Sequence, residues 1–156
     1  MSTRFVVPDG EAVGELLSIV LGDGTSAADA SVTDFSGYYA ASYIDDDDKL
    51  VAVGICNTPF VFYSGAALST IPAGAASDMM AEGEPSDSIF DNFYEVMNIC
   101  SRLLMTEQDE HHLRVAKTFK PAEAASVISE ITDGVTKCFN LAIPSYGEGE
   151  MHFIVT

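Results

Sequence analysis

The stretch Ser86–Met105, SDSIFDNFYEVMNICSRLLM, has the apolar periodicity of an amphipathic helix. At about 100° per residue, its large apolar side chains share one face: Ile89, Phe93, Met97, Cys100 and Leu104. Four polar residues lie within about 60° of each other on the opposite face: Asp91, Glu95, Asn98 and Arg102. Asparagine is unfavourable in a helix interior because its amide competes for backbone hydrogen bonds. The polar stripe is therefore either an ordinary solvated face or a face that carries a function.

Apolar patterns and chain-breaking residues predict the elements around this helix. Asp9 is placed to cap a first helix that Gly22 ends, and a loop follows over 22–30. Strands are expected over 35–44, 50–56, 60–71, 113–119, 136–143 and 151–155, and shorter helices over 72–80 and 121–130. This pattern is α+β, with helices packed on a largely antiparallel sheet. The length and the 47% apolar composition fit one domain over 1–156.

The order of elements and the sequence EVMN, from Glu95 to Asn98, together resemble the CheC/CheX family of chemotaxis phosphatases, in which a helix carries Glu-x-x-Asn. The resemblance runs from about Leu50 to Thr156. It includes LVAVGIC and VFYSGAALSTI as paired strands, PAGAASDMMAEG as a short helix, and VTKCFNLAIP with EMHFIVT as a closing hairpin. The single motif copy is similar to CheX-type members and implies a CheC/CheX-like fold. The alternative is an unrelated acidic α+β domain whose motif is accidental.

The resemblance implies dephosphorylation of the phospho-aspartate of a CheY-type response regulator, in chemotaxis or two-component signalling. Asn98 would orient the hydrolytic water, and Glu95 would pair with a lysine of the regulator. Asp91 and Arg102 would contact the partner. The regulator would hold the Mg²⁺, so no cofactor is expected in this chain. A carboxamide suits the task because it donates and accepts hydrogen bonds without titrating.

The chain departs from the family pattern just after Asn98. Family members place Ala or Ser and then Gly soon after the motif, whereas Arg102 and Leu103 stand here where Gly is expected. Arg102 would either contact an acidic regulator surface or obstruct docking. The alternative function is a non-catalytic response-regulator-binding or motor-switch-like adaptor of the same superfamily. Inward packing of Glu95 or Asn98, with bonds to the protein's own backbone, would count against hydrolysis.

The composition restricts the classes of partner. The net charge is −17, and the seven Lys and Arg residues are spread along the chain, so no nucleic-acid or anionic membrane surface is expected. No apolar run reaches the ~18 residues of a membrane span, and the first residues lack the apolar core of a signal peptide. Cys56, Cys100 and Cys138 lie in apolar patterns that favour buried, reduced thiols. These features predict a cytoplasmic protein.

The sequence also bears on metal binding and on self-association. The acidic run Asp45–Asp48 lies between apolar runs and predicts a hairpin tip, because it lacks the alternation of a calcium loop. His111 and His112 are adjacent and diverge in either regular structure, which is poor geometry for a shared metal. The resemblance, together with the apolar runs 51–56 and 60–62, predicts a homodimer formed through exposed sheet edges.

Overall fold

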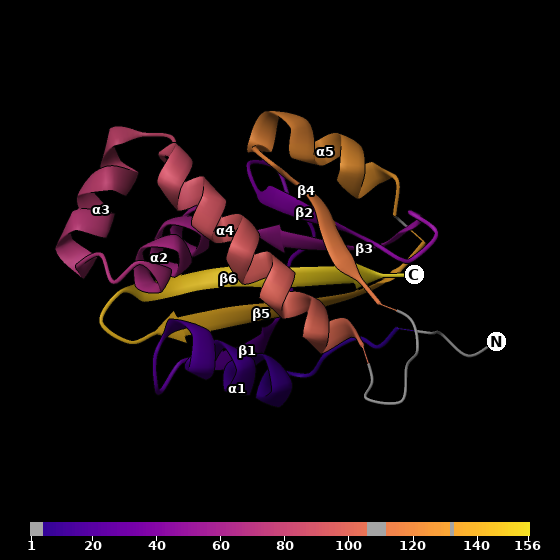
Figure 1. The fold of residues 1–156 in the computed structure, drawn as a ribbon, viewed down its shortest axis with the longest axis horizontal. Coiled ribbons are helices and arrows are strands. Elements are labelled where there is room, and N and C mark those ends of the chain that lie inside the picture. Colours follow the sequence, from indigo (N-terminus) through magenta and orange to yellow (C-terminus); the bar gives the residue numbers. More distant parts are fainter. Residues whose placement is uncertain (1–4, 106–111, 132) are drawn as a thin grey trace.

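The chain was analysed as a computed structural model that describes residues 5–105, 112–131 and 133–156 (Figure 1). The predicted motif helix is α4, and its last turn continues as the 3-10 helix η1. The elements in chain order are α1 (Gly10–Leu21), β1 (Ser26–Ala30), β2 (Tyr39–Ile44), β3 (Leu50–Cys56), α2 (Thr58–Leu68), α3 (Ala73–Glu82), α4 (Asp87–Ile99), η1 (Cys100–Leu104), β4 (Arg114–Phe119), α5 (Pro121–Ser129), β5 (Val135–Ile143) and β6 (Gly147–Val155).

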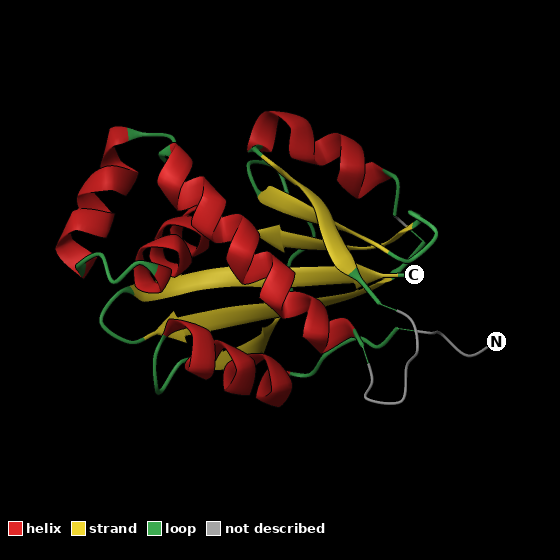
Figure 2. Cartoon of the chain, viewed as in Figure 1, coloured by secondary structure: helices red, strands yellow, loops and turns green. Residues whose placement is uncertain are grey.

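The strands within the described residues form one antiparallel sheet in the order β1-β5-β6-β3-β2-β4. The long hairpin of β5 and β6 occupies one half of the sheet, and β1 and β4 are its two edges. Helices α1, α2 and α4 lie over one face, whereas α5 lies on the other (Figure 2). This architecture confirms the α+β fold class expected from the sequence.

Strand β3 separates two apolar cores, one on each face of the sheet. Its residues Ala52 and Cys56 belong to the larger core under α1, α2 and α4. Val53 and Ile55 belong to the smaller core, which α5 covers with Ala124 and Val127. Because both faces are buried, the strand reads as a continuous apolar run rather than an alternation.

Local signals set the predicted helix start and the predicted hairpin. The Asp9 carboxylate accepts a hydrogen bond from Ala12 N at 2.8 Å and so caps α1. The acidic run forms the tip between β2 and β3, where Asp45 Oδ1 accepts from the backbone N–H groups of Asp47 and Lys49 at 2.9 and 3.0 Å. The short polar side chain of Asp45 therefore stabilises the turn itself.

The strand predicted over 60–71 is wrong, because this segment forms helix α2. Asn57 Oδ1 accepts from Phe60 N at 3.1 Å, and Pro59 lies in the first helical turn, so the local chemistry starts a helix. The helix is buried around most of its circumference, which removes the periodic signal. Gly65 is no strand bulge: a Cβ there would lie 2.9 Å from Ile89 O, so glycine allows α2 to approach α4.

Three strands also differ from the prediction, and the first of them is β2, which begins at Tyr39 rather than at Phe35. The loop predicted over 22–30 contains β1, an edge strand of small residues that pairs with β5 and lies under α1. The last strand begins at Gly147 rather than at Met151, because the predicted loop closes as a tight turn over Pro144–Tyr146. Small and polar residues have low strand propensity, so β1 and the first four residues of β6 depend on pairing with β5.

The apolar runs behind the homodimer prediction do not lie at sheet edges. Residues 51–56 belong to β3, which is paired on both sides by β2 and β6. Residues 60–62 are buried in α2. Neither run is therefore available to pair with a second copy, and only the family resemblance still supports a homodimer.

Candidate functional site

Helix α4 presents its polar stripe to solvent, as the periodicity predicts. The Ser86 hydroxyl oxygen accepts from Ile89 N at 3.2 Å and caps the helix. The opposite face is fully buried in the larger core at Ile89, Phe93, Met97, Cys100 and Leu104. On the outer face Asp91, Glu95 and Arg102 are exposed, while Asn98 is half-buried. The four candidate residues therefore share one side of α4 and η1.

Asn98 is half-buried because it contacts the edge strand β4. Its Oδ1 accepts a hydrogen bond from Val115 N at 3.3 Å, and Tyr94 donates from its hydroxyl to Val115 O at 3.2 Å. We call this pair of bonds the Val115 contact. Within the described part of the chain, Asn98 Nδ2 has no hydrogen-bond partner. The amide oxygen thus serves the fold, whereas the amide NH₂ group is left available.

Inward packing with bonds to the protein's own backbone would count against hydrolysis. Asn98 meets this criterion in part. A hydrogen bond of 3.3 Å is longer than the usual 2.9–3.0 Å and occupies only the acceptor end of the amide. Glu95 does not meet the criterion, because its carboxylate is exposed and forms no ion pair with any residue the structure describes. A free carboxylate and a free amide NH₂ lie one turn apart on one helix face.

Arg102 lies one turn beyond Asn98, on the exposed side of η1. Leu103, which follows Arg102, is buried at 9% exposure and packs in the larger core. The large residue after the motif therefore has a packing role. Because Leu103 is buried, Arg102 is the charged group that a partner approaching this end of α4 would meet.

Cations gather along the same edge of the sheet, although each is paired with an acid. Arg114 bonds Asp48 at 2.6 Å, Lys117 lies 3.9 Å from Glu123, and Lys120 lies 3.8 Å from Glu84. All six side chains are well exposed, so each pair contributes little stability. Both signs of charge are present, and the edge forms no basic patch.

A second polar group lies away from α4 and was not predicted from the sequence. Glu150 on β6 accepts three side-chain hydrogen bonds: Tyr38 Oη and His152 Nε2 bond Oε1 at 2.8 and 3.0 Å, and Asn57 Nδ2 bonds Oε2 at 3.0 Å. We call these four residues the Glu150 cluster. Tyr38 and Glu150 are 112 positions apart, so no local motif marks the cluster.

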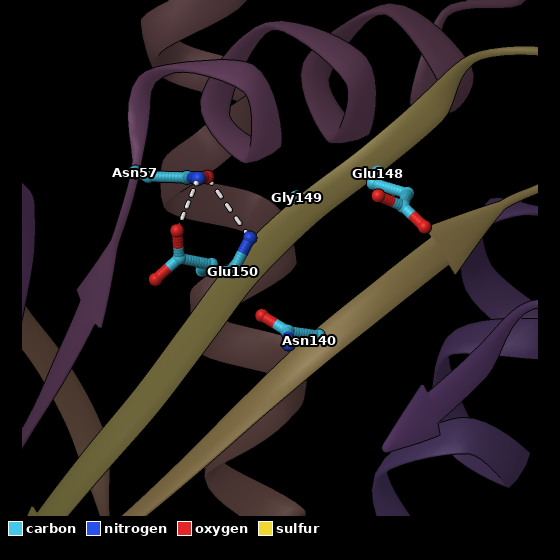
Figure 3. A pocket seen from close by; sticks show the side chains of 5 residues that line it. All are labelled: Asn57, Asn140, Glu148, Gly149 and Glu150. Carbon is cyan, nitrogen blue, oxygen red and sulfur yellow. Dashed lines mark hydrogen bonds between the residues drawn. The ribbon is translucent and has the colours of Figure 1, made fainter. Parts of the chain in front are cut away.

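The Glu150 cluster borders a polar pocket of about 310 Å³. Figure 3 shows the Asn57 side chain directed at both the Glu150 carboxylate and the Glu150 backbone N–H, with Asn140 on the neighbouring strand. Glu148 and Gly149 complete the lining. The Asn57 oxygen also caps α2, so one amide joins the helix start to β6.

The hydrogen bonds fix the protonation of this cluster. His152 Nδ1 accepts from Phe139 N at 3.2 Å, so the ring proton is on Nε2 and is donated to Glu150. Desolvation lowers the pKa of His152, and Glu150 partly offsets the shift. Desolvation, with the Glu150 bond, raises the pKa of Tyr38 to about 12. A neutral histidine and a neutral tyrosine facing a fully bonded carboxylate form a structural network.

The remaining candidate chemistries find no site in the described residues. Within them, no group of three or more His, Cys, Asp or Glu is arranged to hold a metal ion. Cys56, Cys100 and Cys138 are buried free thiols, and desolvation raises the pKa of Cys100 to about 12. His112 is exposed, and His111 lies outside the described residues. No described helix is both long and apolar enough to cross a bilayer.

Comparison with known proteins supports the fold. No protein-family model matches the chain, and no curated protein matches it significantly. The FliM middle domain from H. pylori is similar with a TM-score of 0.52 at 10% identity, over 94% of this chain and 84% of that one. The FliM middle domain from Vibrio alginolyticus gives 0.50 at 11% identity, over 94% and 87%.

A CheX chain from Borrelia burgdorferi, crystallised with CheY, BeF₃ and Mg²⁺, is also similar. It is 9% identical over 93% of each chain, with a TM-score of 0.45, which is too low to carry an argument. The FliM comparisons define the fold: this chain is an α+β protein whose fold is similar to that of FliM middle domains. At these identities the likeness concerns the fold alone.

Proposed function

We propose that this protein binds a phosphorylated CheY-type response regulator through the exposed face of α4 and hydrolyses its aspartyl phosphate. One observation carries the proposal: the Glu95 carboxylate and the Asn98 NH₂ group lie one turn apart on the solvent face of α4, and neither has a partner among the residues that the structure describes. Residues at this spacing point the same way, so one helix delivers both groups to a partner's pocket. Asp91 and Arg102 extend the contact surface at either end.

The chemistry needs little from this chain. A water oxygen forms a bond to phosphorus as the bond from phosphorus to the aspartyl oxygen breaks, and the carboxylate leaves with the bonding electron pair. The water proton passes to a phosphate oxygen or to solvent. Positioning and charge neutralisation account for most catalysis of phosphoryl transfer. In this proposal the regulator supplies Mg²⁺ and a lysine, and this chain holds no cofactor.

Asn98 and Glu95 have different roles in this scheme. Asn98 Nδ2 donates to one lone pair of the water and leaves the other directed at phosphorus. Glu95 pairs with the regulator's lysine, a contact that favours association. Response regulators of this type act in the cytoplasm, so the proposal places the protein there, and the family resemblance adds a homodimer. Light scattering at micromolar concentration tests the dimer, and a single 16.6 kDa species would contradict it.

A non-catalytic adaptor is the second candidate, and a specific observation favours it. The bond from Val115 N to Asn98 Oδ1 gives the asparagine a structural role that requires no reaction. In that case the regulator binds the face of α4, and its phospho-aspartate decays at the intrinsic rate. Arg102 and the absent glycine then adapt the surface to binding alone.

One experiment separates the candidates. A panel of CheY-type receiver domains is phosphorylated with a small-molecule phosphodonor in Mg²⁺, and the decay of the aspartyl phosphate is followed with wild-type protein and with Asn98→Ala. Hydrolysis predicts accelerated decay that the substitution abolishes, while both proteins still bind the receiver. Equal decay rates with retained binding would select the adaptor. Loss of binding to every receiver domain would remove both candidates.

A further inference from the structure

We infer that Tyr94 is a positioning residue for Asn98. This inference rests on the proposed function of the α4 face. The two side chains are four residues apart, so they lie one above the other on α4. Both bond the same residue of the neighbouring strand: Tyr94 donates to Val115 O at 3.2 Å, and Asn98 accepts from Val115 N at 3.3 Å. The Val115 contact thus holds the helix to the sheet at two points around the candidate catalytic group.

The strand offers these two groups because β4 is an edge. Among the strands that the structure describes, β4 pairs with β2 alone, so the outward N–H and C=O groups of Val115 have no strand partner there. The register also shifts beside Val115, since Tyr43 pairs with Val115 while Ser42 pairs with Lys117. Such irregularities bend an edge strand and terminate further pairing, and they are frequent near functional sites. Tyr94 and Asn98 occupy the positions that a further strand would take.

The consequence concerns which end of the Asn98 amide a partner meets. A flipped amide would turn NH₂ toward the Val115 N–H and lose the bond, so the oxygen faces β4 and the NH₂ group faces outward. Toward a partner, the Asn98 amide then presents only hydrogen-bond donors, next to the Glu95 carboxylate. Its ligand at Asn98 is an oxygen acceptor, either the attacking water or a phosphoryl oxygen. Tyr94 maintains this orientation by holding Val115 at a fixed distance from α4.

The test removes one hydroxyl and nothing else. Tyr94→Phe deletes the bond to Val115 O but keeps the ring. Tyr146→Phe is the matched control. Tyr146 is also half-buried, and its hydroxyl also donates to a backbone carbonyl, that of Ile71. Neither Tyr146 nor Ile71 belongs to α4 or β4. For both variants we measure the decay rate of a phosphorylated CheY-type receiver domain at saturation, the dissociation constant for that domain, and the amide exchange rate of Val115 by NMR.

Tyr94→Phe should lower the saturating decay rate by about five- to tenfold, because small misplacements of a positioned group are costly. The dissociation constant should change less than twofold, and Val115 amide exchange should accelerate by roughly tenfold. Tyr146→Phe should leave all three quantities unchanged. The same changes in both variants, or unaltered Val115 exchange in Tyr94→Phe, would overturn the inference. If the wild-type protein does not accelerate decay, the proposed function fails, and Val115 exchange alone decides the positioning role.

Discussion

The face of α4 and the Glu150 cluster both gather polar side chains, but they differ in how fully those side chains are bonded. In the Glu150 cluster both carboxylate oxygens and both histidine nitrogens have partners within 3.2 Å. On α4 the Glu95 carboxylate and the Asn98 NH₂ group have none among the described residues. Buried polar groups that are fully bonded stabilise a fold, whereas an exposed unpaired donor beside a free acid is available to a ligand.

Asn98→Asp gives the largest expected effect and tests the comparison most directly. The carboxylate oxygen can still accept from Val115 N, so the free energy of unfolding should change by less than about 1 kcal/mol. The NH₂ donor is lost, and the added charge repels a phosphoryl group. Accelerated decay of the phospho-regulator should therefore disappear. Urea titration and the decay assay measure the two quantities, and retained acceleration would show that the donor is unnecessary.

Glu150→Ala should affect stability instead of activity. The substitution leaves the hydroxyl of Tyr38, the Nε2 proton of His152 and the Asn57 NH₂ group without their acceptor. Because the His152 ring is buried and the Tyr38 and Asn57 side chains are half-buried, we expect a loss of about 1–3 kcal/mol in the free energy of unfolding by urea titration. Glu148→Ala, on the same strand and exposed, is the control and should cost less than about 0.5 kcal/mol. Equal losses in the two variants would contradict a structural role for the cluster.

The pH dependence of stability is a second test of the same cluster. The pKa of His152 is lowered from 6.5 by desolvation, so below pH 6.5 the unfolded chain binds this proton more readily than the folded chain does. The contribution of His152 is therefore complete above pH 6.5 and falls as the pH drops toward its folded-state pKa. Urea titrations between pH 7.5 and 5.5 measure the slope. His152→Gln should flatten it, and an identical slope in that variant would refute the assignment.

Glu95→Gln should have the smallest effect, confined to association. The side chain is exposed and keeps its size, so stability should not change measurably. Loss of one charge should raise the dissociation constant for a CheY-type receiver domain severalfold, mainly at low salt. Titrations at two ionic strengths provide the measurement. A salt-independent effect, or a lower decay rate at saturation with unchanged affinity, would place Glu95 in the chemical step.

The sequence predicts the features that depend on neighbours in the chain. Ser86 caps α4 by a bond to Ile89, three residues further on. Helical geometry places Phe93 on the buried side and Glu95 on the exposed side. Helix α2 was mispredicted because its burial removes the periodicity, although Asn57 and Pro59 carried a helix-start signal. Strand β1 gives no signal of its own, since its small residues form a strand only beside β5.

In the candidate site, too, the sequence predicts only what depends on neighbours in the chain. Glu95 and Asn98 are found by their spacing on one helix, so their common side is predictable, whereas the sequence does not single out Tyr94. The partner of Asn98 is not, because Val115 reaches it only through the sheet and lies 17 positions further on. The Glu150 cluster is less accessible still: Tyr38, Asn57 and His152 come from segments that meet only in the finished fold.

The Val115 contact has a consequence for how whole molecules meet. An exposed edge strand is a template on which another chain can extend the sheet, a route to aggregation that folded proteins must block. At Val115 the groups that would bond an incoming strand are already occupied by Tyr94 and Asn98. Helix α4 therefore blocks intermolecular strand addition at Val115. A variant that loses both side chains should be judged by its solubility as well as by its chemistry.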